Sequence, residues 1–91
     1  MQKKFKVEYG KAVSTDFERI GKQNTLRVRK KIRWFSEQEN PLRFSEPLVG
    51  LKNRYRWRIG DWRVIFKKNE QTKQLIILMI LAIRKRDKAY D

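Results

Sequence analysis

The chain contains no cysteine and no histidine among its 91 residues. The absence of cysteine excludes a disulfide framework and a thiolate zinc site. The absence of histidine removes the commonest general base and the commonest metal ligand, and with it any Ser-His or Cys-His nucleophile. The ten acidic residues are scattered along the chain instead of clustered as a two-metal nuclease requires. We therefore expect no metal and no cofactor.

Long hydrophobic runs are missing as well. The longest apolar stretch, residues 75–83, is too short to span a bilayer. The N-terminus leads directly into an alternating segment, so no signal peptide is expected. These features predict a cytoplasmic protein without a membrane partner. A chain of this length suffices for a modest core, and residues 1–91 are expected to form a single domain.

Positive charge is what the chain has in excess. Lysine and arginine number 24 against 10 aspartate and glutamate residues, which gives a formal net charge of +14. This imbalance exceeds what solubility requires. It indicates a polyanionic partner such as nucleic acid, an anionic membrane or an acidic protein, whereas a merely solvated basic surface is the alternative.

Residues 55–66 carry the clearest structural signal. Two alternating segments flank Gly60 and Asp61, a dipeptide typical of a two-residue hairpin turn. This turn sets the register, so that Arg58 is expected opposite Arg63. Side chains then sort onto two faces of the ribbon. The apolar face holds Tyr55, Trp57, Ile59, Trp62, Val64 and Phe66, and the arginine face holds Arg54, Arg56, Arg58, Arg63, Ile65 and Lys67.

The arginine face is the first candidate site. Arg58 and Arg63 would carry like charges at directly opposed positions, and such pairs repel. The pairing therefore favours a bound anion over a merely solvated face. Arginine suits phosphate because its planar group donates two parallel hydrogen bonds and keeps its charge. We predict that this face turns away from the helices, towards solvent or a partner.

Hydrophobic periodicity predicts the remaining elements. A strand is expected over residues 4–9, and helices over about residues 11–22 and 24–40. A capping box at Thr15 and Glu18 is expected in the first helix, and a cap at Asn24 or Thr25 for the second. Residues 42–53 are typical of a connecting loop, and residues 75–83 of a central strand buried on both faces.

The predicted fold class is α+β. A strand and an antiparallel helix pair precede a three-strand antiparallel meander, and the helices pack on one face of the sheet. Because the helices must cover the apolar face, its aromatic residues are expected in the core instead of stacking on bases. Trp34, beside the apolar stripe of the second helix, receives the same assignment.

The arginine face can also support metal-free cleavage of RNA. In that reaction the ribose 2′-hydroxyl attacks the adjacent phosphate and leaves a 2′,3′-cyclic phosphate. Arginines would orient the strand and stabilise the negative charge of the transition state. Arg84 and Tyr90 follow the last predicted strand and could reach this face.

The hairpin, the apolar strand after it and the segment from Arg84 to Tyr90 together resemble the RelE/ParE toxin superfamily, in its RelE-like, mRNA-cleaving branch. The resemblance covers nearly the whole chain. It implies a toxin of a type II toxin–antitoxin pair that enters the ribosomal A site and cuts mRNA there. The partners it implies are the ribosome with its mRNA and a cognate antitoxin, acidic where it touches the toxin, in a hetero-oligomer.

The same resemblance implies roles for single residues. It assigns Arg63 to the scissile phosphate, Arg84 to the leaving group and Tyr90 to the substrate base, as catalytic residues together with Arg58. The residues expected to bind nucleic acid around them are Lys52, Arg54, Arg56, Lys67 and Arg86.

One departure from the RelE pattern concerns proton transfer. Arg56 and Arg58 fall where some RelE members carry lysines, one of them a proposed general base. A guanidinium is a poor base, so Arg58 is expected to stabilise charge, and Tyr90, Lys52 or ribosomal groups to move protons. Two alternatives stay open: a ParE-like toxin that inhibits DNA gyrase, and a non-catalytic nucleic-acid-binding relative.

Overall fold

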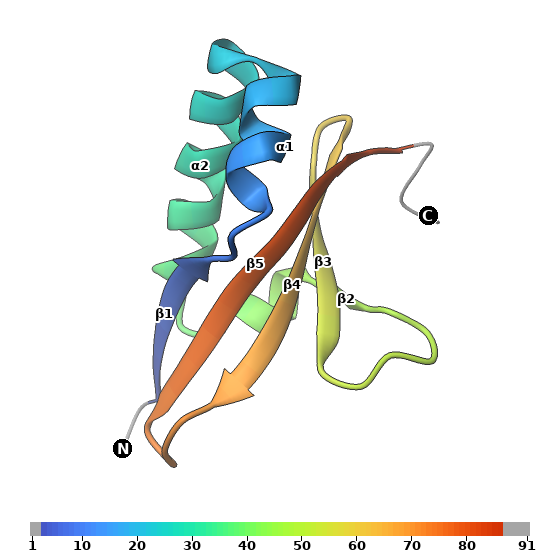
Figure 1. Ribbon diagram of the computed structural model, residues 1–91. Coiled ribbons are helices and arrows are strands. Elements are labelled where there is room, and N and C mark those ends of the chain that lie inside the picture. Colours follow the sequence, from blue (N-terminus) through green and yellow to red (C-terminus); the bar gives the residue numbers. More distant parts are fainter. Residues whose placement is uncertain (1–2, 87–91) are drawn as a thin grey trace.

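A computed structural model of the chain describes residues 3–86 (Figure 1). Two helices pack on a five-stranded mixed sheet, which confirms the predicted α+β class. The helices are α1 (Val13–Ile20), α2 (Lys22–Ser36) and a short 3₁₀ helix, η1 (Pro41–Phe44). The strands are β1 (Lys4–Tyr9), β2 (Glu46–Pro47), β3 (Arg54–Ile59), β4 (Trp62–Glu70) and β5 (Leu75–Lys85). No helix within this described part is long and apolar enough to cross a bilayer.

The strands lie in the order β1-β5-β4-β3-β2 across the sheet. β1 pairs parallel with β5, and all other neighbours are antiparallel. The last strand is therefore central, as predicted, with Leu78 buried on one face and Ile77 on the other. It continues to Lys85, beyond the predicted end at residue 83, because β4 pairs with it over this extra length.

The β3–β4 hairpin has the predicted register. Arg58 lies opposite Arg63 and Ile59 opposite Trp62, so Gly60 and Asp61 alone form the turn. The backbone of Gly60 has a φ of 59°, in the left-handed region that favours glycine. A local turn signal thus sets the pairing of the two strands that carry most of the arginine face.

The predicted helix caps are wrong. α1 begins at Val13 with Ala12 as its N-cap, and no side chain caps it, so the capping box at Thr15 and Glu18 does not form. α2 begins at Lys22, directly after Gly21, ahead of the predicted cap at residue 24 or 25. Gly21 has a φ of 88°, which lets the chain reverse between the helices within one residue.

Asn24 and Thr25 instead tie the two helices together. The Asn24 side chain donates a hydrogen bond to the Ile20 carbonyl oxygen at 2.8 Å, and the Thr25 hydroxyl donates to that of Phe17 at 2.9 Å. These bonds join side chains of α2 to backbone carbonyl oxygens in the last turn of α1, and the Phe17 oxygen also accepts from the Gly21 N–H at 3.1 Å. The antiparallel helix pair therefore forms as predicted, with a tighter junction.

The core lies between the helix pair and the apolar face of the hairpin, as predicted. Trp57 is fully buried and stacks between Phe35 of α2 and Phe66 of β4, with ring centroids 4.9 and 4.1 Å away. Its indole N–H donates to the Pro41 carbonyl oxygen at 3.1 Å. Trp57 and Phe66 are fully buried and hold the sheet on the helices, whereas Tyr55 and Trp62 are partly buried and pack against the same core.

Two further expectations need correction. Trp34 is 42% exposed and packs edge-on against Phe35 and Phe44 at the surface, because it lies beside the buried stripe of α2 and not on it. Residues 42–53 are more than a loop, since η1 and β2 both lie in this segment. β2 extends the sheet beyond β3, with Glu46 paired to Arg56.

Candidate functional site

Three arginines lie in one row across the sheet. Arg58 of β3 pairs with Arg63 of β4, which pairs in turn with Arg84 of β5. Paired residues place their side chains on the same face. The adjacent row, which is fully buried against the helices, consists of Trp57, Val64 and Ile83. We call Arg58, Arg63 and Arg84 the arginine row, and it lies on the face away from the helices.

A bulge in β5 places Arg84 in this row. Phe66 pairs with Ile80, but the preceding Ile65 pairs with Ala82, so Leu81 is the extra residue on β5. An extra residue reverses which side chains face the core. Without it, Arg84 would share the helix-facing side with Ile80. The sequence carries no local signal for this bulge. The sequence predicted only that Arg84 could reach the arginine face.

The arginine face is less exposed than predicted. Arg58 and Arg84 have side chains that are 52% and 43% exposed, whereas Arg56 and Arg63 are buried, at 9% and 5% exposure. Arg63 turns one guanidinium nitrogen back onto the hairpin turn, where Nη1 donates to the carbonyl oxygens of Gly60 and Trp62 at 2.9 and 3.0 Å. The row therefore has two exposed ends and a buried centre.

An internal carboxylate lies beside the first arginine of the row. Glu46 Oε1 is 2.7 Å from Arg58 Nε and 3.6 Å from Arg56 Nε. Both members of the closer pair are about half exposed, so water and salt screen the attraction. Glu46 escaped the sequence prediction because its segment has the composition of a loop. The short strand β2, invisible in the sequence pattern, brings it to Arg58.

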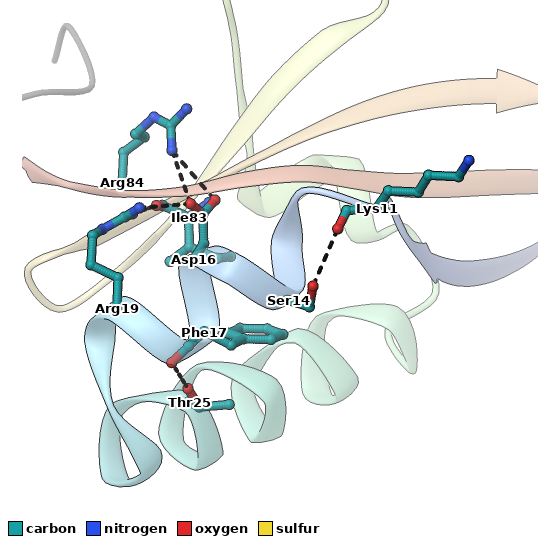
Figure 2. Close-up of polar contacts among 8 residues, drawn as sticks. All are labelled: Lys11, Ser14, Asp16, Phe17, Arg19, Thr25, Ile83 and Arg84. Carbon is teal, nitrogen blue, oxygen red and sulfur yellow. Dashed lines mark hydrogen bonds and ion pairs between the residues drawn. The ribbon is translucent and has the colours of Figure 1, made fainter.

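A second carboxylate holds the other end of the row (Figure 2). Asp16 of α1 is 5% exposed, and both of its oxygens lie 3.3 Å from Arg84 Nη1. It also accepts hydrogen bonds from Arg19 Nη1 at 2.8 Å and from the Ile83 backbone N–H at 2.9 Å. A hint existed in the sequence, since Asp16 follows Val13 by three residues, at the spacing of the buried helix stripe.

The other predicted nucleic-acid-binding residues surround the row unevenly. Arg54 and Lys67 pair with each other and are partly buried, about 14 Å along the strands from Arg58 and Arg63. Lys52 and Arg86 are exposed. The Arg86 backbone N–H donates to the Asp61 carbonyl oxygen at 2.9 Å, which holds the end of β5 beside the hairpin turn. Tyr90 lies outside the described residues.

A groove of about 620 Å³ connects the row to α2. Arg58 and Gly60 form one wall, and Trp34 lies on the other, with Lys31 Nζ 4.3 Å from its ring centre. The lining contains one acidic residue, Glu37, and five basic ones: Arg27, Lys30, Lys31, Arg33 and Arg58. The positive surface therefore continues from the sheet onto the helix. Within residues 3–86 no three side chains of the metal-ligating types lie close enough to share an ion.

The fold resembles that of chains in solved toxin–antitoxin complexes. The solved RelBE2 complex of Mycobacterium tuberculosis contains a chain with 18% identity and a TM-score of 0.62, over 91% of this chain and 99% of that one. A chain of the RelE–RelB complex of Pyrococcus horikoshii OT3 has 24% identity and a TM-score of 0.59, over 98% of this chain and 100% of that one. A chain of the RelB–RelE complex of Methanococcus jannaschii has 22% identity and a TM-score of 0.55, over 91% of this chain and 94% of that one. Because these identities are low, the structural likeness establishes a shared fold and nothing more.

Family membership comes from the sequence. Residues 7–90 match the model of the ParE toxin of type II toxin–antitoxin systems, and this match covers most of the chain. The protein therefore belongs to this toxin family, within the RelE/ParE superfamily that its sequence resembles. No curated protein gives a significant match.

Proposed function

We propose that this toxin is a metal-independent endoribonuclease that cuts mRNA in the ribosomal A site. The observation that carries the proposal is the arginine row, which sets three arginines in register on neighbouring strands, on the face away from the helices. Clustered guanidinium groups stabilise the charge that develops on a phosphate during cleavage. The cytoplasm, where translating ribosomes are found, would be its place of action.

In the proposed reaction, the 2′-oxygen attacks the adjacent phosphorus while the bond from phosphorus to the 5′-oxygen breaks. The 2′-hydroxyl proton passes to a base, and the leaving 5′-oxygen gains a proton. The products are a 2′,3′-cyclic phosphate and a 5′-hydroxyl. Arg63 would contact the scissile phosphate, Arg84 the leaving oxygen and Arg58 the remaining charge, while Tyr90 would orient the base.

We add Glu46 to the groups proposed to accept the proton. Its carboxylate lies 2.7 Å from Arg58 and is half exposed, whereas Arg58 itself cannot act as a base. A carboxylate within hydrogen-bond reach of the attacking hydroxyl can serve as general base. Glu46 thus joins Tyr90, Lys52 and ribosomal groups as a candidate for this step. Because Arg63 is buried, the proposal also requires its guanidinium to become accessible when RNA enters.

The nuclease proposal is tested by mapping mRNA ends on translating ribosomes incubated with the purified protein. We expect cleavage inside the A-site codon, with 2′,3′-cyclic phosphate and 5′-hydroxyl termini. Cleavage should require the ribosome and persist in excess chelator. Intact mRNA under conditions in which the toxin still arrests growth would contradict the proposal.

Inhibition of DNA gyrase is the second candidate function, and the match to the ParE toxin model favours it. A gyrase inhibitor would block supercoiling in a purified assay and leave mRNA intact. The arginine row argues for the nuclease, since gyrase inhibition does not need guanidinium groups aligned around a phosphate. A non-catalytic nucleic-acid-binding protein would show salt-dependent binding with neither activity.

A cognate antitoxin is the partner we propose for the free toxin. The similar solved structures are toxin–antitoxin complexes, and the net charge of +14 suits an acidic partner. The antitoxin would cover Arg58 and the groove toward Trp34 and thereby keep RNA away from the row. A structure of the complex in which Arg58 and Arg84 stay as exposed as in the free chain would contradict this masking.

A further inference from the structure

Asp16 is a buried carboxylate that the proposed cleavage reaction does not use. It lies on the inner face of α1 beside Val13 and Ile20, and its side chain is 7% exposed. A charge in such a place is unfavourable unless partners compensate for the lost water. The hydrogen-bond and ion-pair partners of Asp16 therefore make its burial tolerable, and one of them is Arg84 of the arginine row.

The partners of Asp16 form a closed cluster (Figure 2). Asp16 Oδ1 accepts from Arg19 Nη1 at 2.8 Å, and Oδ2 accepts from the Ile83 N–H at 2.9 Å. The second guanidinium nitrogen of Arg19 donates to the Ile83 carbonyl oxygen at 2.9 Å. Both backbone groups of Ile83 are thus paired with side chains from α1.

This cluster replaces a strand. β1 ends at Tyr9, opposite Ile80, and its last contact to β5 is the Gly10 N–H donating to the Ile80 carbonyl oxygen at 2.8 Å. Beyond that point β5 has no strand on this side, and unpaired backbone groups there would be costly to bury. Asp16 and Arg19 satisfy these groups and fix the backbone one residue before Arg84.

Asp16 also holds the Arg84 side chain directly. Arg84 Nη1 lies 3.3 Å from both carboxylate oxygens. Within residues 3–86, Nε and Nη2 of Arg84 have no hydrogen-bond partner, and its side chain is 43% exposed, so donors remain for a phosphate oxygen. The carboxylate also offsets the repulsion between Arg84 and its neighbour Arg63.

We propose that Asp16 is a positioning residue that holds Arg84 in the orientation required for cleavage, through direct contact and through the Ile83 backbone. This inference rests on the proposed nuclease function. Asp16 acts from the helix side of the sheet edge and does not touch the substrate. Misplacing a reacting group by about 1 Å can lower a rate by about 100-fold, and we expect losses up to that size when the carboxylate is neutralised.

A double-mutant cycle tests the proposal. Asp16→Asn keeps an acceptor for the Ile83 N–H but loses the charge, and Glu18→Gln on the exposed side of the same helix is the matched control. Asp16→Asn should lower kcat by up to about 100-fold with little change in KM, and it should add little further loss to Arg84→Ala. Equal losses in both backgrounds would overturn the proposal.

A second readout does not depend on activity. In a sample with ¹⁵N-labelled arginine, Asp16→Asn should shift the Arg84 side-chain NMR signal and raise its mobility, whereas Glu18→Gln should leave both unchanged. If the wild type cleaves no mRNA, the nuclease function fails, yet this signal still decides whether Asp16 orders Arg84. An unchanged Arg84 signal in folded Asp16→Asn would refute the positioning role.

A further variant covers the case in which Asp16→Asn does not fold. Asp16→Glu keeps the negative charge and moves the carboxylate by one carbon–carbon bond. It should retain the fold, lower kcat in the wild-type background and leave the rate of Arg84→Ala almost unaltered. A wild-type rate in Asp16→Glu together with an altered Arg84 signal would overturn the proposal, because cleavage would then not depend on that orientation.

Discussion

Single acidic side chains set the environment of the arginine row at each of its ends. Glu46 contacts Arg58, and Asp16 contacts Arg84, yet the two carboxylates differ in exposure. Asp16 is buried with a 7% exposed side chain, whereas Glu46 is half exposed. Removing the Asp16 carboxylate should therefore affect stability as well as activity, and removing the Glu46 carboxylate should affect activity alone.

Glu46→Gln should lower the cleavage rate and leave stability almost unchanged. The Glu46–Arg58 pair is half exposed, and such pairs contribute about 1 kcal/mol or less to the free energy of unfolding. Loss of a general base lowers rates by about 10²–10⁴-fold. Single-turnover cleavage and urea unfolding measure the two effects. A wild-type rate for Glu46→Gln would remove Glu46 from the proton transfer.

Asp16→Ala should destabilise the fold by about 1–3 kcal/mol, the cost of leaving a buried donor without an acceptor. The donor is the Ile83 N–H, whose bond to Asp16 is buried. Glu18→Ala, an exposed change on the same helix, should have little effect. Urea unfolding of both variants checks the difference, and equal midpoints would mean that the Ile83 N–H finds another acceptor.

Individual elements differ in how far the sequence predicts them. The β3–β4 register follows from Gly60 and Asp61 alone, so the opposition of Arg58 and Arg63 was predictable. The Leu81 bulge depends on how β4 and β5 pair. The residues of these two strands become neighbours only in the folded chain. No local pattern reveals it, and it decides the face on which Arg84 lies.

β2 and the start of α2 escaped prediction for different reasons. β2 is two residues long and exists because Glu46 and Pro47 pair with β3, a contact that periodicity cannot show. α2 starts at Lys22 because Gly21 reverses the chain in one residue. For β2 a tertiary contact outweighs local preference, whereas the start of α2 follows from the local conformation of Gly21.

Gly60→Ala should weaken the hairpin. Gly60 has a φ of 59°, and a side chain in this left-handed conformation costs about 1–2 kcal/mol. An added Cβ would lie 3.4 Å from Arg27 Nη2, a flexible group that can move. Gly60→Asn should lose less, because asparagine tolerates this conformation. Urea midpoints should rank wild type above Asn above Ala, and a more stable Ala variant would contradict this backbone argument.

The molecule as a whole combines a buried aromatic core with a basic outer surface. Net charge predicted a polyanionic partner, but charge alone could not separate nucleic acid from an acidic protein. The structure shows how the basic residues are arranged: three arginines form a row on the sheet, and a basic groove leads from Arg58 to α2. Family membership adds the toxin–antitoxin context.

RNA binding should weaken with salt in proportion to the phosphates contacted. For single strands the slope of log K against log salt changes by about 0.7 per phosphate. Arg54→Ala and Lys67→Ala should each reduce the slope by about this amount if each contacts one phosphate. Lys73→Ala, in the turn between β4 and β5 at the end of the sheet away from the arginine row, is the charge-matched control and should leave it unchanged.

The arginine row is the central claim, and the cleavage rate of its variants on translating ribosomes tests it most directly. Removing one group that stabilises transition-state charge costs about 10²–10³-fold in kcat. Arg63→Ala and Arg84→Ala should each lose about this much, while Lys73→Ala keeps the wild-type rate and thermal melting confirms that all three fold. Wild-type cleavage by the folded Arg63→Ala and Arg84→Ala proteins would contradict the account.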